Sequence, residues 1–186
     1  MYANITLRPA EVVDVQRVLA GSRRSAYLFG LGDAVVAFDE ASDRQDGSVE
    51  ALAREISRQC RCAALAVLNH DDDVLMYHLY SNGEEIDEYN SAPGYWEWDG
   101  EDDEPGPRGG NSEVLAKALG HGDKRGDLQT ALVGEYDFES DRHRSLCAML
   151  ELPLQAVGFG FSDLARGDRV GFDTSGGRLI KVGPEE

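Results

Sequence analysis

The sequence predicts an α+β fold, in which an antiparallel or mixed sheet is followed by a mostly helical C-terminal part. The first observation is a three-stranded meander at residues 62–95, where Asn82 and Gly83 form the two-residue turn typical of a tight hairpin. The second is that residues 2–70 alternate between strand-like and helix-like apolar periodicity. The third is a series of helix-starting residues and helical apolar stripes after residue 110.

The turn also predicts the register of the last two meander strands. With Asn82 and Gly83 as the loop residues, Ser81 faces Glu84. Three further pairs follow from it: Leu79 with Ile86, His78 with Asp87, and Met76 with Tyr89. Side chains of a strand alternate between faces, so one face should carry Leu75, Tyr77, Leu79 and Ile86, and the other Val74, Met76, His78, Tyr80 and Tyr89. Both faces carry apolar side chains, so we expect helices over one face and partial cover by the C-terminal third over the other.

The order of the expected elements suggests a topology. They are a strand at 2–8, a helix that follows Pro9 and ends near 19, strands at 26–29 and 34–38, a helix that begins at Ser48, and a strand at 63–69. Strand, helix, strand, strand, helix, strand is the split βαβ pattern of ferredoxin-like folds. The two remaining meander strands would extend that sheet beside its fourth strand.

We expect one α+β domain over residues 1–186. Residues 1–98 would form the sheet, and residues 99–110, DGEDDEPGPRGG, an acidic loop rich in Pro and Gly. Residues 111–186 would be mostly helical, beginning at the N-cap residue Asn111, with a weak hairpin at 169–182.

Several absences predict the compartment. The sequence has no apolar run near 18 residues, and its first residues lack the basic and apolar regions of a signal peptide. The three cysteines, Cys60, Cys62 and Cys147, do not form a disulfide pattern. We therefore expect a cytoplasmic protein.

Net charge restricts the class of partner. Asp and Glu number 35 against 18 Lys and Arg, a formal net charge of −17. Such a chain repels nucleic acid and anionic membranes and attracts basic proteins. We expect a basic protein partner, although acidity can also serve solubility alone. The sequence leaves the oligomeric state open.

An acidic belt occupies the interval between Arg61 and Arg108, which contains no Lys or Arg. Its thirteen acids are Asp71, Asp72, Asp73, Glu84, Glu85, Asp87, Glu88, Glu97, Asp99, Glu101, Asp102, Asp103 and Glu104. Charges can protect an exposed sheet edge from aggregation, or they can dock a basic partner. The alternate acids Asp99, Glu101 and Asp103 do not match the EF-hand pattern, so no metal site is predicted.

Three aromatic residues, Tyr95, Trp96 and Trp98, precede the most acidic part of the belt, residues 101–104. Aromatic rings beside carboxylates can bind Arg or Lys by stacking and pairing. The predicted partner-binding residues are therefore Tyr95, Trp96, Trp98, Glu101, Asp102, Asp103 and Glu104. The alternative is that the aromatic rings fold over a sheet face.

A possible polar site consists of His78, Asp87 and His143. The predicted register places His78 opposite Asp87, where the carboxylate could orient the imidazole for base catalysis, but no motif supplies a nucleophile. His143 lies in the charged segment DRHR and is expected at the surface. The Cys60-Arg61-Cys62 segment lacks zinc-site spacing, and there is no phosphate-binding glycine motif. No catalytic residue, metal ligand or cofactor is assigned.

The strings NHDDDVLMYHLY and NGEEIDEYNSAPGY, with DRHRSLCAMLELP and AVGFGF further on, resemble an uncharacterised family of small bacterial cytoplasmic proteins. The resemblance covers most of the chain. It implies a bacterial, cytoplasmic, single-domain protein. Since that family has no assigned activity, the resemblance implies no catalytic residues.

Two functions from different classes follow from the sequence. The first is a non-enzymatic acidic interaction module, in its sharpest form an immunity or inhibitor protein that occludes a basic toxin or nuclease. The alternative is a small hydrolase or transferase with a His- and Asp-lined pocket. A concave pocket holding two or more of the polar residues above would favour the enzyme, and an acidic surface without one would favour the module.

Overall fold

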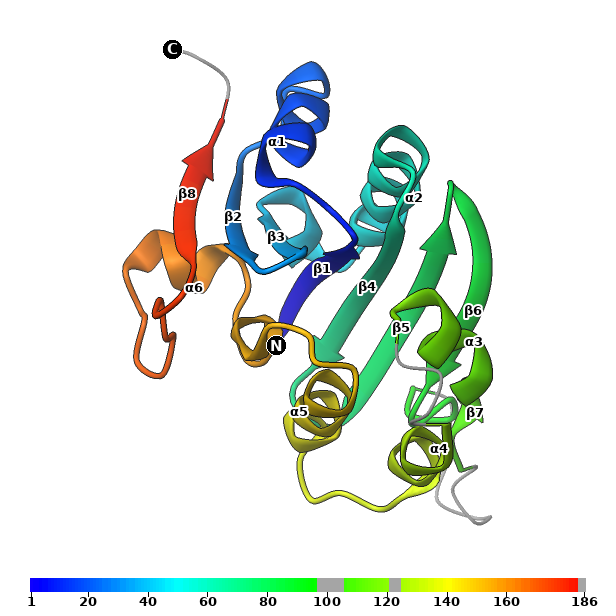
Figure 1. Ribbon diagram of the computed structural model, residues 1–186. Coiled ribbons are helices and arrows are strands. Elements are labelled where there is room, and N and C mark those ends of the chain that lie inside the picture. The colour runs from blue at the N-terminus through cyan, green and yellow to red at the C-terminus, as the bar shows by residue number, and fades with distance from the viewer. Residues whose placement is uncertain (97–105, 121–124, 184–186) are drawn as a thin grey trace.

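A computed structural model describes residues 1–96, 106–120 and 125–183 and confirms the α+β fold (Figure 1). One antiparallel sheet has the strand order β7-β6-β5-β4-β1-β3-β2-β8. Its strands are β1 (Tyr2–Arg8), β2 (Ala26–Leu31), β3 (Ala34–Asp39), β4 (Ala63–His70), β5 (Val74–Ser81), β6 (Glu84–Asn90), β7 (Arg108–Gly109) and β8 (Arg178–Val182).

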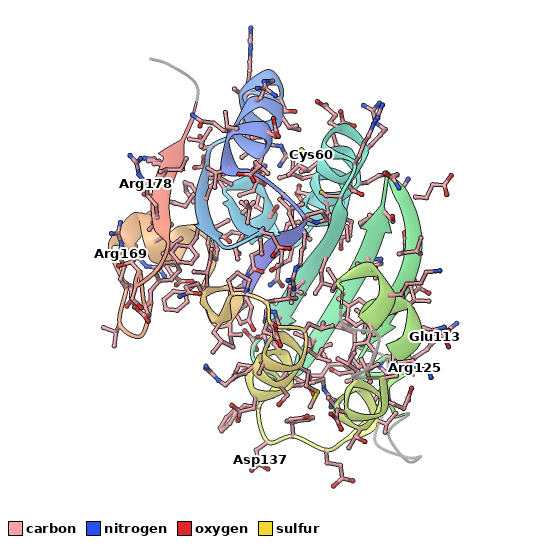
Figure 2. All side chains as sticks on the ribbon, in the orientation of Figure 1. Cys60, Glu113, Arg125, Asp137, Arg169 and Arg178 are labelled. Atoms are coloured by element: carbon pink, nitrogen blue, oxygen red, sulfur yellow. The ribbon has the colours of Figure 1, made fainter. Side chains whose placement is uncertain are left out.

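Helices cover both faces of the sheet. The α-helices are α1 (Val12–Gly21), α2 (Ser48–Cys60), α3 (Ser112–Ala118), α4 (Arg125–Val133), α5 (Glu139–Met149) and α6 (Phe161–Arg166), with short 3-10 helices η1 (Ala41–Arg44) and η3 (Leu154–Ala156). The first two α-helices form one core with the sheet, and α3 to α6 form a second core on the opposite face. An exposed ion pair, Arg125 to Glu113 at 3.0 Å, joins α4 to α3 (Figure 2). Within the described residues, no helix combines the length and apolar character needed to cross a membrane.

The predicted order of the first six elements is confirmed. The strand order β4-β1-β3-β2 is that of the split βαβ pattern, and β5 and β6 extend it beside β4. The predicted hairpin within residues 169–182 is wrong, because β8 pairs with the edge of β2, where Ala26 faces Val182. An edge strand presents unpaired backbone groups, and β8 satisfies those of β2. The predicted loop at 99–110 is also wrong at its end, since Arg108 and Gly109 pair with β6 as β7.

The alternation of β1 separates the two cores. Ala3, Ile5 and Leu7 are buried against the α1 and α2 side. The intervening polar side chains face the C-terminal half, where Asn4 Nδ2 donates to the carbonyl oxygens of Ala156 (2.6 Å) and Phe159 (3.0 Å). These bonds satisfy backbone groups of the C-terminal half and so help to position it on the sheet.

The predicted register of β6 is correct for the first two pairs after the turn, Ser81 with Glu84 and Tyr80 with Glu85, and wrong for the pairs beyond them. Asn82 and Gly83 have φ values of 53° and 86°, and Ser81 faces Glu84 as expected. A β-bulge at Ile86 then shifts the ladder by one residue. The observed pairs are Leu79 with Asp87, His78 with Glu88, Tyr77 with Tyr89, and Met76 with Asn90.

The bulge moves Tyr89 to the face opposite the predicted one. Its ring stacks on Tyr77 at 5.3 Å, and its hydroxyl donates to the carbonyl oxygen of Leu132 at 2.7 Å. Without the bulge the ring would share a face with His78, away from α4. Burial of a tyrosine against the α4 side therefore accounts for the register shift.

Candidate functional site

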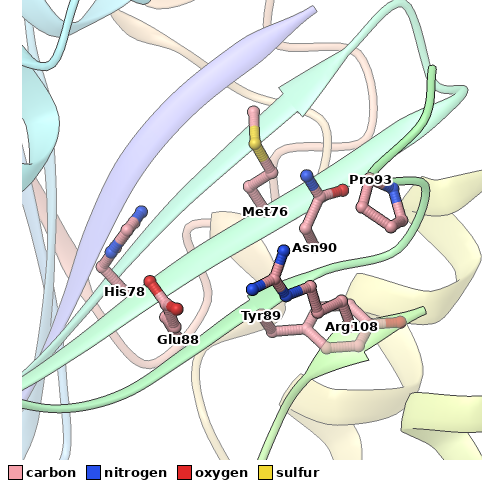
Figure 3. A pocket seen from close by; sticks show the side chains of 7 residues that line it. All are labelled: Met76, His78, Glu88, Tyr89, Asn90, Pro93 and Arg108. Atoms are coloured by element: carbon pink, nitrogen blue, oxygen red, sulfur yellow. The ribbon is translucent and has the colours of Figure 1, made fainter. Parts of the chain in front are cut away.

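A hollow lies over β5 and β6, on the face of the sheet that α2 covers further along (Figure 3). Met76 and His78 of β5 pair with Asn90 and Glu88 of β6, so these four side chains share one face. Tyr89, Pro93 and Arg108 complete the lining of a cavity of about 330 Å³, which we call the outer hollow. Its ionisable groups are the imidazole of His78, the carboxylate of Glu88 and the guanidinium of Arg108.

A second carboxylate joins this histidine. His78 Nδ1 lies 3.0 Å from Glu85 Oε1, and the potential ligand atoms of His78, Glu85 and Glu88 all lie within 4.8 Å of one another. Arg54 of α2 reaches the other oxygen of Glu85 at 3.6 Å. The three side chains could hold a divalent cation, and they equally suit the ammonium or guanidinium group of a partner. The sequence did not indicate this cluster, because only the bulge places Glu88 beside His78.

The three residues of the predicted polar site do not come together. The pairing of His78 with Asp87 is wrong, since the bulge turns Asp87 to the other face. There its carboxylate accepts hydrogen bonds from Tyr77 Oη (2.7 Å) and the Asn111 backbone N–H (2.9 Å). Burial, together with the neighbouring charge of Asp87, raises the pKa of Tyr77. Asp87 therefore links β6 to the start of α3.

The predicted surface position of His143 is wrong. Its side chain is buried between α5 and the sheet, where the hydroxyl of Tyr2 lies 2.8 Å from Nδ1 of His143. The neighbouring Arg142 is also buried and pairs with Glu139 at 2.7 Å. The charged segment DRHR thus turns two of its members inward, because Arg142 finds both a carboxylate and backbone carbonyl acceptors there.

Aromatic residues gather at the β4–β5 turn. Trp96 is 57% exposed and Tyr95 37% exposed, and both rings contact the ring of His70, at 5.5 and 6.0 Å between centroids. The Tyr95 hydroxyl donates to Asp73 at 3.1 Å, which raises the pKa of that hydroxyl. Asp71 lies 3.6 Å from His70. We call these five residues the aromatic patch.

The aromatic patch and the outer hollow share one face of the sheet. His70 faces Val74, and the alternation along β5 continues through Met76 to His78. Pro93 lines the outer hollow two residues before Tyr95. Of the predicted partner-binding set, Tyr95 and Trp96 are described: Tyr95 contacts Asp73 of the β4–β5 turn, and Trp96 contacts His70 and Tyr95. The others, Trp98, Glu101, Asp102, Asp103 and Glu104, lie outside the described residues.

The cysteines do not supply a nucleophile to this face. Burial raises the pKa of the Cys62 and Cys147 thiols to about 12 and also raises that of Cys60. A thiol with a raised pKa is a poor nucleophile at neutral pH. In addition, neither Ser nor Cys is among the described residues that line the outer hollow.

Comparison of the chain with models of known protein families, with curated proteins and with solved structures finds no significant match.

Proposed function

We propose that this chain is an acidic protein-interaction module that binds a basic protein partner through the aromatic patch and the outer hollow. In its most specific form, the proposal is that the chain is an immunity or inhibitor protein that occludes a basic toxin or nuclease. The observation that carries the proposal is Trp96, a large exposed ring held beside His70 and Tyr95, which themselves contact Asp71 and Asp73. Trp and Tyr are the side chains that most often anchor protein interfaces.

Charge supports a basic partner. The chain has a net charge of −17, and the two acids of the aromatic patch, Asp71 and Asp73, are exposed. An arginine or lysine of the partner could stack on Trp96 and pair with these carboxylates. Such complementarity mainly raises the rate of association and makes it sensitive to salt.

The outer hollow supports a second contact. Glu88 lines this cavity, and Glu85 lies beside His78 next to it, so two carboxylates stand against the one cation of the lining, Arg108. The cavity is large enough for one long side chain. Met76 and Pro93 offer apolar surface for the stem of that side chain. Two anchoring points on one face would fix the orientation of the partner.

The proposal includes a cytoplasmic location. The three cysteines are free thiols, and disulfides are rare in reducing compartments.

A crosslinking experiment in the native host tests the partner and the surface together. A photoreactive amino acid is placed at Trp96 in one variant and at Val13, another exposed apolar residue, in the control. We expect position 96 to capture one basic protein that position 13 does not capture. Capture of the same proteins at both positions, or of an acidic protein at position 96, would overturn the proposal.

Kinetics with the captured partner then test the carboxylates. Glu85→Gln/Glu88→Gln should lower the association rate roughly tenfold at low salt, and the difference should shrink as salt screens charges over about 10 Å at 0.1 M. Glu135→Gln, which removes an exposed carboxylate between α4 and α5, is the matched control and should have little effect. Equal rates for the double variant and the wild type at every salt concentration would exclude docking at the outer hollow.

The acidic segment at 101–104 has its own test. Replacement of Glu101, Asp102, Asp103 and Glu104 by Ser should leave folding intact, because substitutions in surface loops usually change stability by less than about 0.5 kcal/mol each. Association with the partner should slow at low salt. An association rate that is unchanged across the salt range would exclude this segment from docking.

A further inference from the structure

We infer that a second cavity binds a small organic anion with an apolar body. This cleft of about 530 Å³ lies between α3 and the sheet, where β1 ends and β4 begins. The aromatic patch lies at the opposite end of β4, about 20 Å along a strand of this length. The inference is independent of the proposed protein partner.

The charge of the cleft is opposite to that of the molecule. Three cations, Arg8, Arg61 and Lys117, line it, and none of the described residues that line it is acidic. The whole chain carries nearly twice as many acids as bases, 35 against 18. Three like charges around one cavity repel one another, and an anion bound between them would relieve that repulsion.

The three cations have different roles. Arg8 is held in place: its Nε pairs with Asp33 at 3.0 Å, and one terminal nitrogen donates to the carbonyl oxygen of Leu150 at 3.1 Å. Asp33 offsets part of this charge. Arg61 and Lys117 are both exposed, and among the described residues neither forms an ion pair. These two cations are therefore the ones that would recognise the ligand's anionic group.

Apart from Ser81, the remaining wall of the cleft is apolar. The bulge directs Ile86 outward, where it is 38% exposed, and Val114 and Ala118 face it from α3. Ligand cavities of a few hundred Å³ commonly combine an apolar lining with a few charged groups that fix orientation. The chemistry that fits is a phosphate or carboxylate group attached to an aromatic or alkyl body.

Titration with defined probes, followed by amide chemical shifts in phosphate-free buffer at low salt, tests the inference. The probes are phenyl phosphate, benzoate, inorganic phosphate and benzyl alcohol. We expect saturable binding of phenyl phosphate or benzoate with shifts at Arg61, Ile86 and Lys117, and the tighter of the two identifies the anionic group. Inorganic phosphate and benzyl alcohol should each bind at least roughly tenfold more weakly, because each lacks one half of the ligand.

Variants separate the cleft from general charge effects. Lys117→Gln preserves helix propensity, and Arg61→Asn suits the left-handed backbone of Arg61, where φ is 52°. Each should weaken binding of the tighter probe roughly tenfold, the loss expected for one charge-assisted contact. The matched control is Arg23→Asn, because Arg23 is exposed, lies outside the cleft and has a similar φ of 53°.

Three results would overturn the inference. The first is a linear, non-saturating response to both organic anions. The second is an equal loss of binding in Arg23→Asn, which would indicate a non-specific charge effect. The third is equal affinity for inorganic phosphate and phenyl phosphate, which would show that the apolar wall contributes nothing.

Discussion

At the scale of single residues, buried polar side chains of the C-terminal half make specific contacts with the sheet. His143 is the clearest case, because its Nδ1 lies against the Tyr2 hydroxyl while its Nε2 has no hydrogen-bond partner among the described residues. Burial, aided by the charge of Arg144, lowers the pKa of His143 from 6.5 to about 3. The imidazole is therefore neutral at physiological pH and would have to gain a proton on unfolding in mild acid.

This pKa predicts a loss of stability in acid. Because the folded pKa is below the unfolded value, the unfolded state binds more protons, and stability falls as pH drops from 6.5 toward 3. At pH 5 the loss due to His143 should be about 2 kcal/mol. His143→Asn retains a group that can accept from Tyr2 but does not titrate in this range, so its free energy of unfolding should depend less on pH. Urea denaturation at pH 7, 6 and 5 measures both proteins, and equal pH dependence would contradict the prediction.

At the scale of elements, the bulge in β6 determines which side chains meet. It places Tyr89 against Tyr77, turns Asp87 toward α3 and leaves Glu88 beside His78. It also directs Ile86 toward the basic cleft. One extra residue thus contributes to the second core, the outer hollow and the cleft.

The extra residue itself should be dispensable for folding. Deletion of Ile86 would leave Asp87, Glu88 and Tyr89 opposite their present partners in a regular ladder, so we expect a change in the free energy of unfolding of less than about 1 kcal/mol. Tyr89→Ala should instead cost about 3–5 kcal/mol, because it empties a buried site for a large ring. Urea denaturation compares the two variants. A deletion as costly as Tyr89→Ala would mean that the bulge is required for the fold of β6.

At the scale of the whole molecule, net charge opposes compactness. The excess of 17 negative charges raises the free energy of the folded state through self-repulsion, most strongly at low ionic strength. Four acids lie on β6 alone, Glu84, Glu85, Asp87 and Glu88. Among the described strands, β7 pairs with only two residues of β6, so most of the outer edge of β6 is unpaired. The acidic side chains of β6 discourage pairing of that edge with other chains.

Salt should therefore stabilise the protein. An increase from 0.01 to 0.2 M NaCl should raise Tm by about 2–4 °C, the shift that about 1 kcal/mol produces in a protein of this size. Glu84→Gln/Glu88→Gln should show a smaller increase, since two of the repelling exposed charges are removed. Thermal unfolding at both salt concentrations checks this, and a Tm that stays constant or falls in the wild type would contradict it.

The sequence by itself determined the local features of this protein and their order. Apolar periodicity predicted the strands and helices of residues 2–70, and Asn82-Gly83 predicted the turn, because backbone preferences and amphipathic patterns act over a few neighbouring residues. The net charge needed no structure at all.

Only the tertiary structure decided which residues meet across the chain. The bulge depends on two contacts with residues more than twenty positions away. The Leu132 carbonyl oxygen accepts a hydrogen bond from the Tyr89 hydroxyl, and the Asn111 backbone N–H donates one to the Asp87 carboxylate. The burial of His143 depends on Tyr2. The three cations that line the cleft beside α3 come from β1, from α3 and from the turn after α2. Packing of distant segments selected these contacts, because the free energy gained by burying an aromatic ring exceeds the local preference of one β-strand for a regular register.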